Sequence, residues 1–149
     1  MSTISMLING QQKQASNGKT FQRKNPLDGK VATTAATVED AIEAIEAASR
    51  AFPEWAAKGP TERRGLLLKA ADALDAKTDD FIKAMAGETG SAAMWAGFNA
   101  HLAANMLREA ASLTTQINGD LIPSDVPGSL AMGVRQPAGV VLGMAPWNA

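Results

Sequence analysis

The 149-residue sequence predicts an α/β fold, and three observations lead to that prediction. Short apolar and polar stretches separated by turn dipeptides occupy the region up to residue 34. Apolar residues then recur at helical spacing from about residue 37 to residue 116. Finally, the run 139–145 is almost continuously apolar, which is typical of a strand buried on both faces of a parallel sheet.

Composition argues against several functional classes. The 14 basic and 15 acidic residues are dispersed and give a net charge of −1, so we expect no nucleic-acid partner. No apolar run approaches the roughly 18 residues that a membrane span needs, and residues 1–7 do not resemble a signal peptide. We therefore expect a cytoplasmic protein with no membrane partner. Cysteine is absent and His101 is the only histidine, so no metal site is expected.

The N-terminal region is predicted to form a β-hairpin followed by further short strands. Asn9-Gly10 is a strong hairpin-turn pair, and it directly follows the apolar residues 6–8. A strand is expected to resume near residues 20–21. Turn residues in 25–29 separate it from an extended stretch over 31–34.

Two amphipathic helices are expected next. Thr37 and Asp40 have capping-box spacing at the start of the first helix, and Pro53 is expected to end it. Gly59-Pro60 introduces the second helix. Its predicted buried face consists of Leu67, Ala70, Ala71 and Leu74.

Two further helices complete the helical region. Thr78 and Asp79 resemble the cap of a short third helix, which Gly87-Glu88-Thr89-Gly90 interrupts. An alanine-rich segment from about residue 91 to residue 116 predicts the longest helix. Beyond it, an extended stretch begins at Leu121-Ile122, residues 123–129 make a turn, and extended structure returns over 130–136.

The final apolar run needs neighbouring strands. A parallel neighbour requires a crossover connection, and none follows before Ala149, so we expect the sequence to be incomplete at its C-terminus. Pro146-Trp147-Asn148 closes this run, at the strand end where open α/β sheets bind ligands. Taken alone, the tripeptide favours a structural interpretation, in which Pro146 ends the strand, Trp147 packs at the core edge and Asn148 caps a turn or helix.

The surrounding residues carry a resemblance to a known family. The run 136–148 resembles the "P-x-G-V … P-W-N" signature of the aldehyde dehydrogenase superfamily, and other family motifs precede it in the same order. They are Ile8-Asn9-Gly10, Asn25-Pro26 with Gly29, Asp40 with Ala47-Ala48, Ala51-Phe52 with Trp55, Pro60-Glu62-Arg63 with Leu66-Leu67, and Glu88-Thr89-Gly90. The lysine that often follows the last motif is Ser91 here. The chain is most similar to the bacterial aromatic-aldehyde branch, in particular the salicylaldehyde dehydrogenases of naphthalene catabolism.

This resemblance implies an N-terminal fragment of the aldehyde dehydrogenase fold, ending in the first strand of a Rossmann-like sheet. Residues 1–117 would be the hairpin and helical part of the cofactor-binding domain. Residues 118–137 would be the strands of an oligomerisation arm, and residues 138–149 the truncated first strand of the core. The full-length parent is expected to be a homodimer or homotetramer.

The implied reaction is the NAD(P)-dependent oxidation of an aldehyde, here an aromatic one, through a cysteine thiohemiacetal. The side-chain amide of Asn148 would stabilise the oxyanion. The residues implied to contact the cofactor are Met144, Ala145, Pro146, Trp147 and Asn148, although ordinary strand packing suits Met144 and Ala145 equally well. NAD is expected, with NADP left open. The cysteine, glutamate and lysine of the family follow the motif, so this chain alone is expected to be inactive.

Substrate selection has one candidate group. Trp95, Phe98 and Leu102 lie on the long helix that flanks the aldehyde tunnel in the family, and they would form an aromatic wall; core packing is the favoured interpretation. We expect His101 to be a surface or hydrogen-bonded histidine, because no carboxylate partner is evident. Glu88 is expected in a turn or cap.

Arg135 is expected to support the strand before the motif. Two alternative functions stay open: a non-catalytic binding or oligomerisation module, and a fragment of a semialdehyde or betaine aldehyde dehydrogenase.

Overall fold

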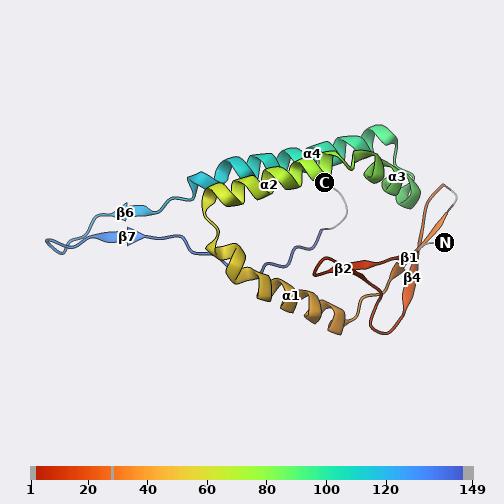
Figure 1. The fold of residues 1–149 in the computed structure, drawn as a ribbon, viewed down its shortest axis with the longest axis horizontal. Helices are drawn as coiled ribbons and strands as arrows, with labels where there is room; N and C mark the ends of the chain where they lie inside the picture. The colour runs from red at the N-terminus through yellow and green to blue at the C-terminus, as the bar shows by residue number, and fades with distance from the viewer. Residues whose placement is uncertain (1–2, 28, 146–149) are drawn as a thin grey trace.

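The computed structural model describes residues 3–27 and 29–145. In this part of the chain, the helices form the middle of the molecule, with β6 and β7 at one end and the N-terminal strands at the other (Figure 1). The helices are α1 (Val38–Ala57), α2 (Pro60–Asp75), α3 (Thr78–Thr89) and α4 (Ala93–Leu113), followed by the 3-10 turn η1 (Thr114–Gln116). The strands are β1 (Thr3–Ile4), β2 (Met6–Ile8), β3 (Gln11–Lys13), β4 (Thr20–Lys24), β5 (Lys30–Thr34), β6 (Asp120–Ile122) and β7 (Ala131–Gly133).

The predicted N-terminal hairpin is confirmed. β2 and β3 pair antiparallel, and the turn residues Asn9 (φ 51°) and Gly10 (φ 74°) both adopt left-handed backbone conformations. That geometry matches the twist of the two strands, which explains the Asn-Gly pair. A second sheet has the order β1-β5-β4, with β4 and β5 antiparallel and β1 parallel to β5.

α1 begins with the predicted capping box but does not end where the sequence suggested. The Thr37 hydroxyl accepts from the Asp40 amide (3.2 Å), and the Asp40 carboxylate accepts from the Thr37 amide (2.8 Å). Pro53, predicted as a stop, lies inside the helix. It is tolerated because Pro53 and Ser49 are both exposed, so water can solvate the carbonyl that loses its amide donor.

The boundaries of α3 also differ from the prediction. Thr78 is its first helical residue and not a cap, because its hydroxyl donates to the Asp75 carbonyl (2.8 Å). The helix also continues through Gly87 and ends at Gly90, which has the left-handed φ of 70° that commonly terminates helices. The Gly-Glu-Thr-Gly sequence is therefore the last turn of α3.

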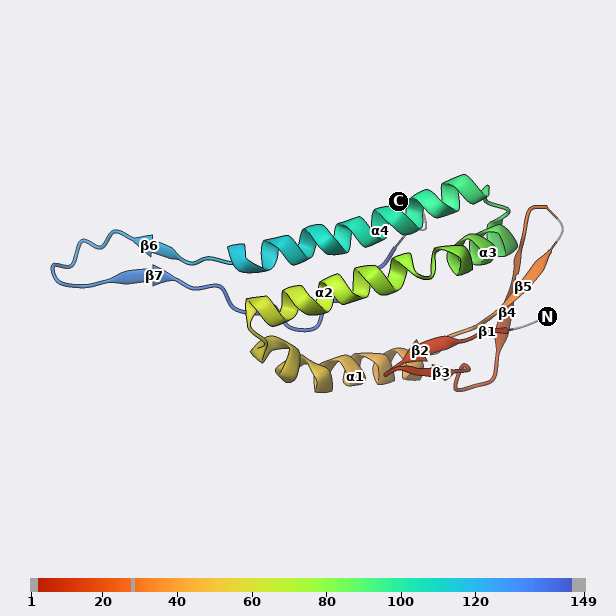
Figure 2. The ribbon, with the colours of Figure 1, turned by 45° about the horizontal axis from the view of Figure 1, so that its top comes forward.

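Small side chains fill the space between the long helices. α2 and α4 run side by side along their length (Figures 1 and 2). On α2, Ala71 is fully buried as predicted, Leu67 and Leu74 are half-buried, and Ala70 is exposed. Alanine side chains permit a close approach of two helices. The buried residues of α4 are Ala96, Ala100, Ala104 and Ala111.

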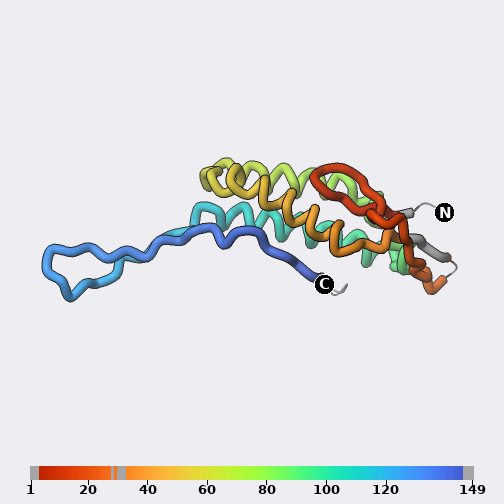
Figure 3. The backbone as a smooth tube through the Cα atoms, turned by 90° about the horizontal axis from the view of Figure 1, so that it is seen from below, coloured from red at the N-terminus to blue at the C-terminus, as the bar shows by residue number. Residues whose placement is uncertain are grey.

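The long hairpin β6–β7 projects away from the helices (Figure 1). After this hairpin, the chain runs back alongside α1, towards the end of the molecule where the N-terminal strands lie (Figure 3). Within the described residues, no helix is long and apolar enough to cross a membrane.

Candidate functional site

The motif that carries the family resemblance is only partly within the described residues. Pro146, Trp147 and Asn148, predicted to hold the cofactor and the oxyanion, lie outside them. Their roles stay predictions. The segment that leads to them, residues 134–145, is described.

The prediction of a buried strand over 139–145 is wrong for this chain. The segment forms no strand, and Val141 (78%), Leu142 (76%) and Met144 (86%) are largely exposed. A strand needs a hydrogen-bonding neighbour, and no strand in residues 3–27 or 29–145 pairs with this segment. The apolar side chains of this segment are therefore not buried by the rest of the described chain.

The nearest apolar surface to this segment is α1. A groove of about 290 Å³ separates the two, and apolar side chains line it from both sides. The lining residues are Ala41, Ala44, Ile45 and Ala48 of α1, and Val140, Val141 and Leu142 of the segment. The segment thus lies beside α1 without packing tightly on it.

Met144 and Ala145 offer an exposed apolar surface just before the motif. Both are exposed to solvent within the described residues. Residues 137–145 contain no charged side chain. The predicted contact of Met144 and Ala145 with the cofactor stays a prediction.

The three predicted substrate residues are exposed on α4. The rings of Trp95 and Phe98 stack with centroids 5.5 Å apart and an interplanar angle of 26°. Trp95 and Phe98 are each 52% exposed and Leu102 is 36% exposed. Within the described residues, alanines form the buried face of α4, and these three side chains lie outside it. The result is an accessible aromatic surface.

His101 is a surface histidine, as predicted, but it does have a carboxylate partner. Its Nδ1 lies 3.1 Å from Asp75, which also accepts from Arg108 at 2.7 Å. These charge-assisted hydrogen bonds, first from Arg108 and then from His101, lower the pKa of Asp75. Arg108 also contacts Asp72 at 2.9 Å, and the pKa of Arg108 is raised by both carboxylates. This cluster joins α2 to α4, so its role is structural.

Glu88 is likewise structural. It lies in the last turn of α3 and forms an ion pair with Arg23 of β4 at 2.9 Å. The adjacent cap comes from Asn25, whose side-chain amide donates to the carbonyls of Ala86 (3.1 Å) and Gly87 (2.7 Å). Two of the family motifs therefore meet at this helix end. The sequence alone did not indicate this role for Asn25, because its partners lie about 60 residues away.

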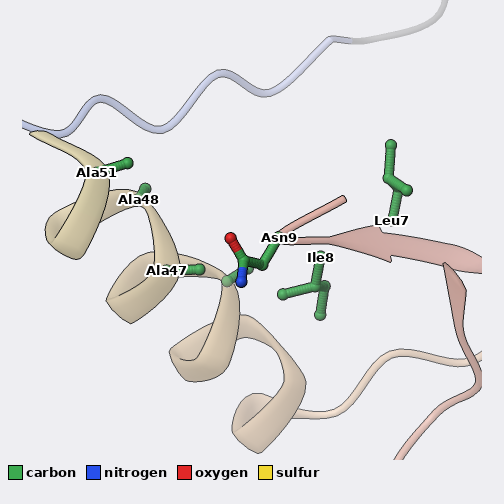
Figure 4. A pocket seen from close by; sticks show the side chains of 7 residues that line it. Leu7, Ile8, Asn9, Ala47, Ala48 and Ala51 are labelled. Carbon is green, nitrogen blue, oxygen red and sulfur yellow. The ribbon is translucent and has the colours of Figure 1, made fainter. Parts of the chain in front are cut away.

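The structure of the hairpin β2–β3 explains the motif Ile8-Asn9-Gly10. Ile8 is 5% exposed and Leu7 is 71% exposed, and the two side chains leave opposite sides of β2 (Figure 4). A pocket of about 280 Å³ separates the hairpin from Ala47, Ala48 and Ala51 of α1. Small residues at these positions leave room for the hairpin beside the helix. The pocket contains no charged or nucleophilic side chain, so it suits packing and not chemistry.

Metal ligands do not cluster in the described part of the chain, where no group of three or more His, Asp or Glu side chains could hold an ion.

Comparison with solved structures identifies the class of fold. A salicylaldehyde dehydrogenase from Pseudomonas putida, solved with salicylaldehyde, matches with a TM-score of 0.85 and 47% identity over 92% of this chain and 29% of that one. An NAD-dependent benzaldehyde dehydrogenase from Corynebacterium glutamicum matches with a TM-score of 0.77 and 29% identity, over 85% of this chain and 28% of that one. The described structure is thus the N-terminal part of a dehydrogenase fold, as predicted.

The family follows from the sequence comparison. The family model "Aldehyde dehydrogenase family" matches residues 13–149, and the chain belongs to that family. A vanillin dehydrogenase from Pseudomonas fluorescens is 60% identical over 100% of this chain and 31% of its own length. The chain therefore spans less than a third of these relatives. The predicted resemblance to the family and its aromatic-aldehyde branch is confirmed.

Proposed function

We propose that this chain is the N-terminal part of an NAD(P)-dependent dehydrogenase that oxidises an aromatic aldehyde to its carboxylic acid. The observation that carries the aromatic preference is the exposed, stacked pair of Trp95 and Phe98 on α4. A flat ring can lie against such a pair with favourable stacking geometry. Vanillin, salicylaldehyde and benzaldehyde dehydrogenases among the similar proteins support the same substrate class.

The Pro146-Trp147-Asn148 motif would supply the hydrogen-bond donor of this part of the site. The Asn148 side-chain amide would donate to the oxygen of the aldehyde as negative charge develops there, and amide donors suit this role because they do not titrate. Met144 and Ala145 would provide an apolar surface for the cofactor and exclude water. The nicotinamide, when bound, supplies the hydride acceptor.

This chain alone would not turn over aldehydes. It contains no cysteine, whereas the family resemblance implies a cysteine nucleophile. Its contribution is to position the substrate wall and the oxyanion donor for groups supplied from elsewhere in the protein.

The test begins with the coding DNA beyond the codon for Ala149, to obtain the complete reading frame. The complete protein should reduce NAD(P)+ with salicylaldehyde or vanillin, and the 149-residue chain should not. Asn148→Ala should lower kcat by about a hundredfold to a thousandfold without abolishing cofactor binding. Normal turnover by Asn148→Ala would refute the oxyanion role.

Substrate preference is tested separately on the complete protein. Trp95→Ala should lower kcat/KM for vanillin by roughly tenfold through lost aromatic contact and leave that for hexanal nearly unchanged. Met106→Ala is the matched control, since Met106 is another exposed apolar residue of α4. Equal losses for both aldehydes would contradict an aromatic wall at Trp95.

The β6–β7 hairpin supports a second proposal, that this segment is an oligomerisation arm. It projects from the helices and carries exposed apolar side chains on both strands, as in the cross-strand pair Leu121 (72%) and Met132 (63%). Exposed apolar surface of this kind marks association sites. The expected partner is a second copy of the protein.

A further inference from the structure

A polar pocket lies where α1, α2 and the segment after β7 converge. Its volume is about 440 Å³, within the range of small-molecule sites. It is distinct from the apolar groove beside Val140 and from the exposed face of α4. The residues that matter for its chemistry are Phe52, Trp55, Arg63, Arg135, Gln136 and Pro137.

Two arginines line this pocket, and neither has a carboxylate partner in the described part of the chain. The Arg63 Nε is buried and makes no hydrogen bond. The Arg135 Nε donates to the Asn118 carbonyl at 3.1 Å, which ties together the two ends of the β6–β7 hairpin. An unpaired buried donor is costly, and most of all when it belongs to a charged group.

The acidic side chains closest in sequence are already engaged. Lys58 forms ion pairs with Glu62 (2.8 Å) and Glu54 (3.2 Å), and these two carboxylates raise the pKa of Lys58. Glu62 directly precedes Arg63 but pairs with Lys58. The two guanidinium groups at the pocket therefore remain available for an external anion.

The remaining walls select the kind of anion. Phe52 and Trp55, one helical turn apart on α1, contribute aromatic surface, and Pro137 contributes an apolar one. We propose that this pocket binds a small aromatic carboxylate, with the carboxylate held by Arg63 and Arg135 and the ring against Trp55 and Phe52. A guanidinium fork matches carboxylate geometry, and aromatic walls suit a flat ring. The binding itself does not depend on the proposed oxidation, although that reaction would generate acids of this class.

The test is calorimetric titration of the complete protein with benzoate, beside benzyl alcohol and inorganic phosphate. Benzoate should bind with a Kd of about 1 mM or tighter. Arg63→Gln should weaken it by roughly tenfold or more, because one charge-assisted partner is lost. Arg64→Gln is the matched control, since Arg64 is its exposed neighbour on α2 and does not line the pocket. Circular dichroism checks that each variant keeps its helices.

Each outcome decides the proposal. Selective binding of benzoate that is lost in Arg63→Gln and kept in Arg64→Gln supports it. Phosphate binding as tight as benzoate, or benzyl alcohol binding as tight, overturns the aromatic carboxylate assignment. Absence of benzoate binding, or unchanged binding in Arg63→Gln, overturns the site. If Arg63→Gln loses helix content, Arg63→Lys decides, because it keeps the charge but removes the fork and should still weaken benzoate binding.

Discussion

Gly90 and Asn25 join the strand region to the helices through contacts at single residues. Asn25 is buried and donates to the last carbonyls of α3, and Gly90 ends that helix with a left-handed backbone. A Cβ atom on Gly90 would lie 2.8 Å from the Leu27 side chain. Backbone conformation and local space therefore both favour glycine at this position.

We predict that Gly90→Ala destabilises the chain by about 1–2 kcal/mol, because the left-handed conformation penalises a side chain. Gly87→Ala is the matched control, since Gly87 is helical with nothing within 4 Å of an added Cβ. It should stabilise by about 0.5–1 kcal/mol. Urea unfolding followed by circular dichroism measures both. Equal effects of the two substitutions would contradict the role assigned to Gly90.

For single residues, the sequence predicts the contacts that form between near neighbours in the chain. Asn9-Gly10 and the Thr37–Asp40 box depend on neighbours within a few residues, and both predictions are confirmed. The pairing of His101 with Asp75 and the capping by Asn25 depend on tertiary structure. Nothing in the spacing of these residues indicates such contacts.

Among the elements, α4 best shows how one helix can have two different faces. Its alanines at 96, 100, 104 and 111 are buried, whereas Trp95, Phe98 and Met106 are exposed. Hydrophobicity alone predicts the opposite, because large apolar side chains usually occupy the core. Here the close approach of α2 leaves space only for small residues.

We predict that Ala104→Leu destabilises the chain by about 1–3 kcal/mol, because Ala104 is fully buried and the added atoms have no space. Ala103→Leu should change stability by less than about 0.5 kcal/mol, since Ala103 is exposed on the same helix. Thermal unfolding compares the two variants. Similar melting temperatures would show that the helix interface adapts to larger side chains.

Helix boundaries were predictable only where the local signal was strong. Proline favours a helix end, yet Pro53 is accommodated on the solvent side of α1. Thr78 resembles a cap, but its hydroxyl bonds to the preceding turn. Both differences arise because propensities are weak compared with the surroundings of the residue.

The described part of the chain exposes many large apolar side chains. The hairpin β6–β7 and the segment 139–145 account for many of them. The sequence correctly indicates the α/β class and the family, but the predicted burial of 139–145 requires neighbouring strands. The apolar pattern of a segment can predict that it favours a buried strand. It does not show whether the neighbouring strands that would bury it are present.

We predict that the chain self-associates through the β6–β7 hairpin. Replacing both Leu121 and Met132 with serine should shift sedimentation towards the monomer, because each buried apolar side chain contributes about 1.5–3 kcal/mol to association. Serine at both Met94 and Met106, which are comparably exposed on α4, is the control and should leave association nearly unchanged. A monomeric unmodified chain, or a larger effect of the control, would refute the hairpin as the contact.

The open groove between α1 and residues 140–142 also has a consequence for the order of assembly during synthesis. The hairpin β2–β3 and the antiparallel helices rely on contacts within the first 116 residues, so they can form while the ribosome is still adding chain, at about 5–20 residues per second. Val140, Val141 and Leu142 would emerge after the helices have formed. They could then pack against the apolar side chains of α1 that line the groove. The side chains of α1 that line the groove would therefore stay exposed until residues 140–142 have been synthesised.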